Sequence, residues 1–250
     1  MIHKKNILFF IGGTFPAGGA ERHLFRLIKN LKEAELYNIE LMLINENFNI
    51  FEDLKIKIHH FKVGRRLISF QTLLSLIKIR KKIKKFALVH SFLNETNFLS
   101  VLFKLFNKKT KLITSKRNQD KWENVQLFYA NISNYFSDII TVNSHSMIDW
   151  YINNERINSD KIRYLPNSIE SHWRFNKKQL DSNKIVITNI GNLNHKKNQI
   201  ALIKAFAELK KEINNIVLNV VGKGKLCNDL IYEIKILNIV DSVFLINNCD

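Results

Sequence analysis

The sequence predicts an α/β protein built from two successive units, each with a parallel sheet. Short apolar runs alternate with segments whose apolar residues recur at helical spacing. The runs are nearly continuous, as in strands that are buried on both faces of a parallel sheet. A polar stretch over 171–183 follows Pro166 and interrupts the pattern once, and the alternation then starts again. We therefore place one domain at 1–166 and a second at 167–250.

The first unit opens with an apolar strand at 6–11 and a glycine-rich turn. The helix that follows, at 20–33, carries Leu24, Ile28 and Leu31 on one face. Further along, Ser144 is a residue type that caps helix N-termini. The remaining elements in order are strands at 39–45 and 56–61, a helix at 69–85, a strand at 87–91, a helix at 97–106, strands at 111–115 and 138–142, a helix at 144–152 and a strand at 161–165.

The second unit repeats the pattern over a shorter length. Strands are predicted at 185–191, 216–221 and 243–246, with helices at 199–211 and 226–237 between them. A three-stranded unit of about 80 residues buries little surface and leaves a strand edge and helix faces uncovered. We therefore expect it to be the first half of a larger domain.

Composition limits the classes of protein to consider. Of the 250 residues, 46% are hydrophobic, which is enough for a packed core and excludes a disordered chain. The two cysteines and eight histidines show no metal-ligand spacing, so no metal site is expected. The first apolar run is too short for a signal peptide, and none reaches the roughly 18 residues of a membrane span. We expect a cytoplasmic protein that can bind peripherally to the inner face of the cytoplasmic membrane.

The charge balance indicates an anionic partner or a compositional bias. Lysine and arginine number 39 against 22 acidic residues, a formal charge of +17. Nucleic acid, an anionic membrane surface and phosphorylated substrates are the candidate partners. No helix-turn-helix, zinc pattern or interleaving of aromatic and basic residues is present, so a nucleic-acid binder is the weakest of these.

Three turns join a strand to a helix and carry glycine or lysine: 12–22, 191–198 and 222–225. Glycine lets backbone amides approach a ligand, and a helix N-terminus favours an anion. The first turn fits neither the dinucleotide pattern nor the P-loop pattern, so a flexible turn is the alternative. Lys196 and Lys197 near a helix N-terminus oppose the helix dipole, which favours an anion such as a diphosphate over a solvated basic turn.

Six segments in order resemble the motifs of glycosyltransferase family 4, whose members have two Rossmann-like domains in the GT-B architecture. The resemblance extends over essentially the whole chain, and it is the order of the motifs that makes it specific. The segments are Gly18–Arg22 (GGAER), His90-Ser91, Asp138–Ser144, Leu165–Glu170 (LPNSIE), Gly191–Asn198 and Gly222–Gly224.

The resemblance implies a transferase that moves a sugar from a nucleotide diphosphate sugar to a lipid-linked or carbohydrate acceptor in bacterial surface polysaccharide or lipopolysaccharide assembly. It implies no metal or other cofactor. Lys197 matches the lysine that clamps the donor diphosphate. The implied donor-binding residues are Gly191, Asn192, Lys197, Gly222 and Gly224, and the implied cleft and acceptor residues are Gly18, Gly19, Glu21, Arg22 and Asn118.

The candidate catalytic residues are Arg117 and His90. Arg117 stands where many family members carry a functional histidine, and since an arginine with a pKa above about 12 cannot act as a base, it would stabilise charge. The alternatives are an ordinary surface arginine and, for His90, a packed histidine. We expect the other histidines to be structural: His23, His59, His60 and His145.

Two departures from the family pattern weaken the transfer of its site residues, and the stop of the chain at Asp250 suggests an alternative function. Asn192 replaces the second clamping arginine of many members, and the glutamate-rich donor motif has no counterpart after Gly224. The alternative is a catalytically incomplete fragment, or the acceptor-binding half of a split enzyme.

Residues 65–86 form a basic amphipathic segment that could face an anionic membrane. The alternative is a core-packed helix with a solvated outer face. The segment combines the apolar residues Leu73, Leu76, Ile77 and Ile83 with the basic residues Arg65, Arg66, Lys78, Arg80, Lys81, Lys82, Lys84 and Lys85.

Overall fold

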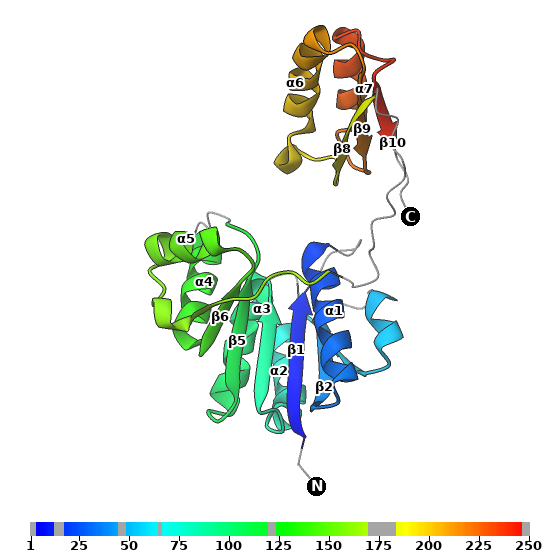
Figure 1. The fold of residues 1–250 in the computed structure, drawn as a ribbon. Helices are drawn as coiled ribbons and strands as arrows, with labels where there is room; N and C mark the ends of the chain where they lie inside the picture. The colour runs from blue at the N-terminus through cyan, green and yellow to red at the C-terminus, as the bar shows by residue number, and fades with distance from the viewer. Residues whose placement is uncertain are drawn as a thin grey trace. The chain divides into compact units, whose positions relative to one another are not determined.

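The computed structural model describes residues 4–12, 18–44, 49–64, 67–119, 124–169 and 184–246. Contacts between residues divide the chain into two compact units, Met1–Trp173 and Arg174–Asp250. Each unit has its own parallel sheet, so the predicted fold class is confirmed. The predicted boundary between 166 and 167 stays a prediction. We describe the units separately (Figure 1).

The first unit contains a seven-stranded sheet in the order β3-β2-β1-β4-β5-β6-β7, and every paired strand is parallel. The strand order reverses at β1, which pairs with β2 on one side and with β4 on the other. The strands are β1 (Lys5–Gly12), β2 (Tyr37–Ile44), β3 (Lys57–Phe61), β4 (Leu88–Phe92), β5 (Lys111–Lys116), β6 (Ile139–Val142) and β7 (Ile162–Tyr164).

Both faces of this sheet are apolar, as the continuous apolar runs predict. In β1, Leu8 and Phe10 belong to one core cluster, whereas Ile7 and Phe9 belong to another. Since successive side chains of a strand point to opposite faces, the two clusters lie on opposite sides of the sheet. Helix α1 (Gly19–Glu33) and the 3-10 helix η1 (Asn49–Leu54) contribute to the second cluster.

Three helices cover the other face: α2 (Phe70–Ile83), α3 (Asn94–Phe106) and α4 (Asn124–Phe136). The sequence analysis missed α4, because its asparagines and aromatic and β-branched residues are weak helix formers. Packing overrides that preference, since Tyr129, Ile132 and Phe136 lie against the same core cluster as α3.

Helix α5 (His145–Glu155) packs beside β6 and β7, which it joins through the 3-10 helix η2 (Ser159–Lys161). Ser144 occupies its N-cap position as predicted, but its hydroxyl bonds to the hydroxyl of Ser146 and not to a backbone N–H. Ser144 is therefore at the predicted N-cap position, but the expected hydrogen bond from a backbone N–H to its side chain is not formed.

The described part of the second unit has three parallel strands in the order β10-β9-β8. Its elements are β8 (Ile185–Ile190), the 3-10 helix η3 (His195–Lys197), α6 (Gln199–Glu212), β9 (Ile216–Val221), α7 (Cys227–Ile236) and β10 (Val243–Ile246). Phe206 of α6 and Leu230 of α7 pack in one cluster with Leu218 and Val220 of β9. Both helices therefore cover the same face of the sheet.

Candidate functional site

Polar side chains of the first unit gather at the carboxyl ends of β1, β4 and β5. In open parallel sheets a crevice forms where the strand order reverses, and ligands bind there. Here the reversal lies between β1 and β4. His90 lies in β4, Arg117 directly follows β5, and Gly18 precedes the helix after β1. The predicted residues of this unit therefore belong to neighbouring elements of one sheet edge.

A cavity of about 600 Å³ opens at this edge. That volume lies within the range of about 300–1,000 Å³ typical of small-molecule sites. Its wall includes amide, carboxylate and aromatic side chains as well as two of the predicted residues: Asn94, Glu95, Arg117, Asn118, Gln126 and Tyr129. Such groups hydrogen-bond hydroxyls and pack against the apolar face of a ring.

Arg117 is a partly buried cation with few partners. Its Nη1 donates a hydrogen bond to Oδ1 of Asn167 at 3.0 Å, and its guanidinium carbon lies 5.2 Å from the ring centre of Phe92. Nε and Nη2 are buried and have no hydrogen-bond partner among the residues that the structure describes. Burial lowers the pKa of Arg117 to about 10, so it remains charged at neutral pH. The cavity wall thus holds a positive charge with unused donors.

His90 lies behind the cavity wall and is buried in the sheet. Its Nε2 is 2.8 Å from Oγ of Ser115, which lies 2.6 Å from Oγ1 of Thr141, and its ring stacks on Phe92 at 4.4 Å. Burial, together with nearby Arg117 and His23, lowers the pKa of His90 to about 3. A neutral imidazole with that pKa is a weak base, so the geometry favours the packed role. The catalytic role of His90 stays a prediction without geometric support.

The GGAER residues lie at the start of α1. Glu21 is buried, and its Oε2 accepts a hydrogen bond of 2.9 Å from the backbone N–H of Gly18, so its carboxylate caps the helix. Gly19 and Arg22 are exposed, and a Cβ at Gly19 would meet no atom within 4 Å. Their predicted cleft role stays open, and Glu21 has a structural task in addition.

The sequence analysis missed a buried ion pair that supports the Arg117 loop. Lys116 Nζ lies 3.0 Å from Oε2 of Glu155, with side chains 5% and 3% exposed. Burial lowers the pKa of Lys116, and the Glu155 carboxylate opposes that shift. The hydroxyl of Tyr151 donates to the carbonyl of Asn118 in the same loop. No sequence signal connects Lys116 with Glu155, because only the fold brings β5 and the end of α5 together.

Leu93 introduces backbone strain at the cavity. It follows β4 with φ 77° and ψ 153°, a conformation in which a side chain is rarely found. Its carbonyl accepts hydrogen bonds from the N–H of Asn97 and the hydroxyl of Thr96. Strain of this kind concentrates at functional sites, and Leu93 is a wall residue of the cavity.

In the second unit, two predicted turns lie against each other at the ends of neighbouring strands. The N–H of Leu193 donates to the carbonyl of Lys223 at 2.9 Å, and the N–H of Leu226 donates to the carbonyl of Leu193. A Cβ on Gly222 would lie 1.9 Å from the carbonyl oxygen of Gly191, and one on Gly224 would lie 2.1 Å from that of Leu193. Both glycines are therefore required by backbone packing, whatever the ligand.

The turns form a basic surface. Lys196, Lys197, Lys223 and Lys225 are all exposed. Within the described part of the chain, no ion pair involves Lys197, and its side chain passes over Gly191, 3.9 Å from where a Cβ would stand. The carbonyl of Asn192 accepts a hydrogen bond from Gln199, which is buried. Exposed lysines on adjoining turns are suited to a diphosphate.

Groups of three or more potential metal ligands are absent from the residues that the structure describes. Helices long and apolar enough to cross a membrane are likewise absent from those residues. The expectation that the protein needs no metal stays a prediction.

Two family models match the chain. The model described as Glycosyltransferase Family 4 matches residues 17–173, and the one described as Glycosyl transferases group 1 matches residues 172–250.

Two curated proteins of Campylobacter jejuni are similar to the chain. One, N-acetylgalactosamine-N,N'-diacetylbacillosaminyl-diphospho-undecaprenol 4-alpha-N-acetylgalactosaminyltransferase, is 25% identical over 93% of this chain and 67% of its own length. The other, a GalNAc-alpha-(1->4)-GalNAc-alpha-(1->3)-diNAcBac-PP-undecaprenol alpha-1,4-N-acetyl-D-galactosaminyltransferase, is 28% identical over 92% of this chain and 65% of its own length. The chain thus spans about two thirds of the length of each relative.

Solved structures share the fold. A Rickettsia africae glycosyltransferase matches with a TM-score of 0.77 at 19% identity, over 99% of this chain and 69% of the other. Anabaena HepE in complex with UDP matches with a TM-score of 0.76 at 16% identity, over 97% and 69% of the two chains. The lipopolysaccharide outer core galactosyltransferase WaaB matches with a TM-score of 0.73 at 14% identity, over 98% and 68%.

Proposed function

Because the chain belongs to glycosyltransferase family 4 and has the GT-B fold, we propose that it transfers a sugar from a nucleotide diphosphate sugar to a lipid-linked or carbohydrate acceptor. The product would enter bacterial surface polysaccharide or lipopolysaccharide, as the named activities of the Campylobacter relatives and of WaaB support. The basic surface on the two adjoining turns of the second unit is the observation that carries the proposal.

The donor's diphosphate would bind at these turns. Negative charge develops on the nucleoside diphosphate as the sugar leaves, and a positive group placed there stabilises the transition state. Lys197 supplies that charge, and the lysines of the neighbouring turn add to it. Gly222 and Gly224 let the two turns pack closely, so the charges lie on one surface. UDP bound to HepE supports a uridine nucleotide as the donor's leaving group.

The acceptor would bind at the cavity of the first unit. Its amide and carboxylate side chains match sugar hydroxyls, and Tyr129 offers an aromatic face. Arg117 would stabilise charge there and would not act as a base, because its pKa of about 10 keeps it protonated. No metal ion takes part in this scheme.

Replacement of Lys197 by alanine is expected to lower the rate of UDP release from UDP-N-acetylgalactosamine by about 10²-fold or more, since loss of one charged contact to a transition state costs about 3 kcal/mol. The assay uses a short-chain prenyl diphosphate sugar as acceptor, with and without EDTA. Lys211→Ala, an exposed lysine of α6, is the control and should keep full activity. Equal rates for Lys197→Ala and the wild type would reject the donor role, and loss of activity in EDTA would reject metal independence.

A second candidate function is a catalytically incomplete or split transferase, and one observation favours it. The face of the second unit's sheet opposite α6 and α7 carries exposed apolar side chains, among them Ile190 (78% exposed), Val186 and Phe244. Parallel sheets normally have both faces covered. Further polypeptide would then complete this unit. UDP release by this chain alone would contradict the candidate, and release only after addition of a separately produced partner polypeptide would support it.

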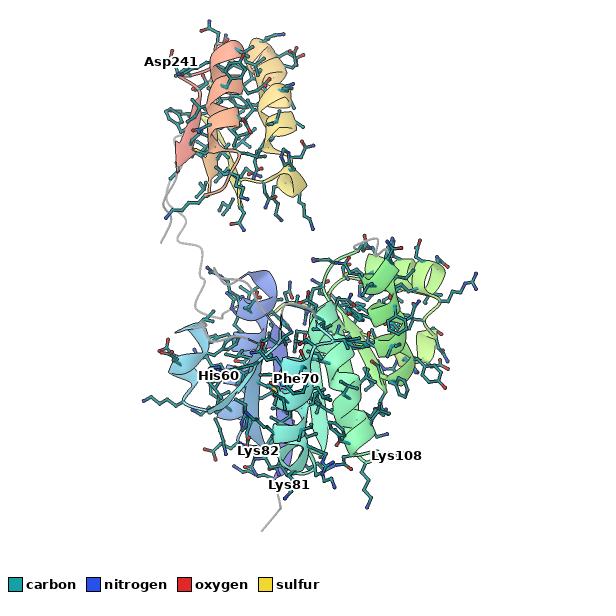
Figure 2. The ribbon with its side chains drawn as sticks, turned by 180° about the vertical axis from the view of Figure 1, so that it is seen from behind. His60, Phe70, Lys81, Lys82, Lys108 and Asp241 are labelled. Carbon is teal, nitrogen blue, oxygen red and sulfur yellow. The ribbon has the colours of Figure 1, made fainter. Side chains whose placement is uncertain are left out.

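We also propose that α2 contacts an anionic membrane surface. The helix packs Leu76, Ile79 and Ile83 into the core, yet Phe70 is 75% exposed and Leu73 is 52% exposed. One outer face of the helix is apolar in its first half and basic toward its end. At helical spacing it carries Phe70, Leu73, Leu74, Ile77, Lys81 and Lys84. Figure 2 shows Phe70 and Lys81 at different levels of this helix.

The variant Lys81→Glu/Lys84→Glu is expected to reduce co-sedimentation with phosphatidylglycerol vesicles at least tenfold, because each basic residue near an anionic surface contributes about 1 kcal/mol. Lys85 is left intact, since it pairs with Glu40. The control variant Lys29→Glu/Lys55→Glu makes the same charge change on the opposite side of the sheet. It should bind the vesicles as the wild type does. Equal co-sedimentation of the first variant and the wild type would remove α2 from the membrane contact.

A further inference from the structure

Within the described part of the chain, three residues near the first unit's sheet edge hold five buried polar atoms that have no hydrogen-bond partner. They are Nε and Nη2 of Arg117, both ring nitrogens of His23 and Oγ of Ser168. About 90% or more of buried polar groups in proteins have a partner, because an unmet hydrogen bond costs about 1–3 kcal/mol. Several such atoms close together mark a place where a polar ligand group can bind.

Contacts connect the three residues into one cluster. Arg117 bonds to the residue directly before Ser168. Arg26, one turn after His23 on α1, donates from Nη1 to the carbonyl oxygen of Ser168 at 3.3 Å. Phe92 links Arg117 and His23, since its ring centre lies 5.2 Å from the Arg117 guanidinium carbon and 6.2 Å from the centre of the His23 ring.

The cluster has the chemistry of an anion site. Arg117 offers unused N–H groups, Ser168 offers a hydroxyl, and a neutral His23 offers one N–H. The charges of Arg117 and Arg26 make the field there positive, and burial together with these two charges lowers the pKa of His23 to about 4. Such a field disfavours a cation and stabilises an anion, and charge-assisted bonds from guanidinium and hydroxyl donors suit a phosphoryl group.

We propose that Arg117, His23 and Ser168 form a phosphoryl-binding subsite on the first unit, entered from the cavity that Arg117 lines. This assigns a binding role to His23, which the sequence analysis takes as structural. Among the described residues, the Arg117 side chain makes one side-chain hydrogen bond and lies over the face of Phe92, so few contacts are broken when it turns toward a ligand in the cavity. The nucleotide-sugar donor and a lipid-linked acceptor both carry a diphosphate, and either one could supply the phosphoryl group. Naming these two as the source rests on the proposed function.

The test measures binding of inorganic pyrophosphate by calorimetry to the full chain carrying Lys197→Ala, so that the basic turns of the second unit contribute less. Adding Arg117→Met or His23→Phe is expected to raise the Kd at least tenfold, and Ser168→Ala about threefold or more. His145→Phe is the matched control, because that exposed ring stacks on Tyr164 at 4.0 Å and phenylalanine can keep the stacking. An unchanged Kd in Arg117→Met and His23→Phe would overturn the subsite.

Stability separates binding from a structural role. Methionine at 117 and phenylalanine at 23 remove unsatisfied polar atoms and keep the apolar volume, so urea midpoints at pH 8 are expected to stay equal or rise. Residues kept for a ligand often show this combination of lost binding and retained stability. Lower midpoints together with weaker binding would overturn the proposal.

Two further ligands identify the source of the phosphoryl group in the chain with Lys197 intact. If Arg117→Met weakens UDP, the subsite serves the donor; if it weakens only a short-chain prenyl diphosphate, it serves the acceptor. Failure to weaken either one overturns the subsite. Pyrophosphate binding with the expected losses but no sugar transfer by the wild type would reject the proposed function and leave the subsite standing.

Discussion

Gly222→Ala is expected to destabilise the second unit by about 3 kcal/mol or more. Its Cβ would lie 1.9 Å from the carbonyl oxygen of Gly191, and Gly222 has φ 155°, where L side chains are rarely found. No side-chain rotation relieves a clash with backbone, so the two turns must separate. Urea unfolding followed by circular dichroism, with amide exchange over 185–246, measures the loss.

Gly191→Ala is the matched control on the facing turn. Its Cβ would meet only the flexible side chain of Lys197, at 3.9 Å, so a loss below about 1 kcal/mol is expected. If both variants unfold at the same urea concentration as the wild type, the contact between the turns does not limit stability. A separate readout, the affinity for UDP, should fall in Gly222→Ala even under conditions where the unit stays folded, because the lysines of the two turns no longer share one surface.

Acidification is expected to destabilise the first unit well above the pH at which carboxylates titrate. His90 and His23 are buried, and burial lowers their pKa values from 6.5 to about 3 and about 4. The unfolded chain therefore binds more protons than the folded one between these values, so stability is full above about pH 6.5 and falls as the pH decreases. At pH 5 the loss is about 2 kcal/mol for each histidine.

His90→Gln tests this sign and its origin. Glutamine retains a hydrogen-bonding group near Ser115 and does not titrate, so the fall in unfolding free energy between pH 6.5 and 5 should become about half as steep. His60→Gln is the control, since His60 is exposed on β3 and labelled in Figure 2. The buried-histidine explanation fails if the His90→Gln slope equals that of the wild type. Hydrogen bonds with His59 and Lys85 lower the pKa of Glu40 against its desolvation, and one from Lys104 does the same for Asp138, so both carboxylates affect stability only at lower pH.

Local sequence patterns predict most of the strands and helices. The missed helix α4 lacks such a pattern. Strands 216–221 and 243–246 are predicted at their observed bounds, because apolar runs between turn residues report burial directly. Helix α4 has no comparable signal, since its residues favour other conformations and only packing against α3 holds it. For the same reason the sequence could not show that Tyr129 and Gln126 of α4 line the cavity.

The candidate site divides in the same way. Glycines and lysines at strand ends identify the turns at 191–198 and 222–225, because these residue types are required locally for close backbone approach and charge. Which atoms those glycines face depends on β8 pairing with β9. A Cβ on Gly222 or Gly224 would meet a backbone carbonyl oxygen, whereas one on Gly191 would meet only the Lys197 side chain. Glu21 has a contact that the motif does not predict, because its carboxylate caps its own helix, and its cleft role stays a prediction.

The sequence by itself determined the fold class, the family and the positions of Lys197 and Arg117, since these depend on residue type and order along the chain. The tertiary structure decided which groups are buried together: Lys116 with Glu155, and Arg117 with His23 and Ser168. The physical reason is that pKa values and unmet hydrogen bonds arise from desolvation and from neighbours distant in sequence, which only the packed sheet brings into contact.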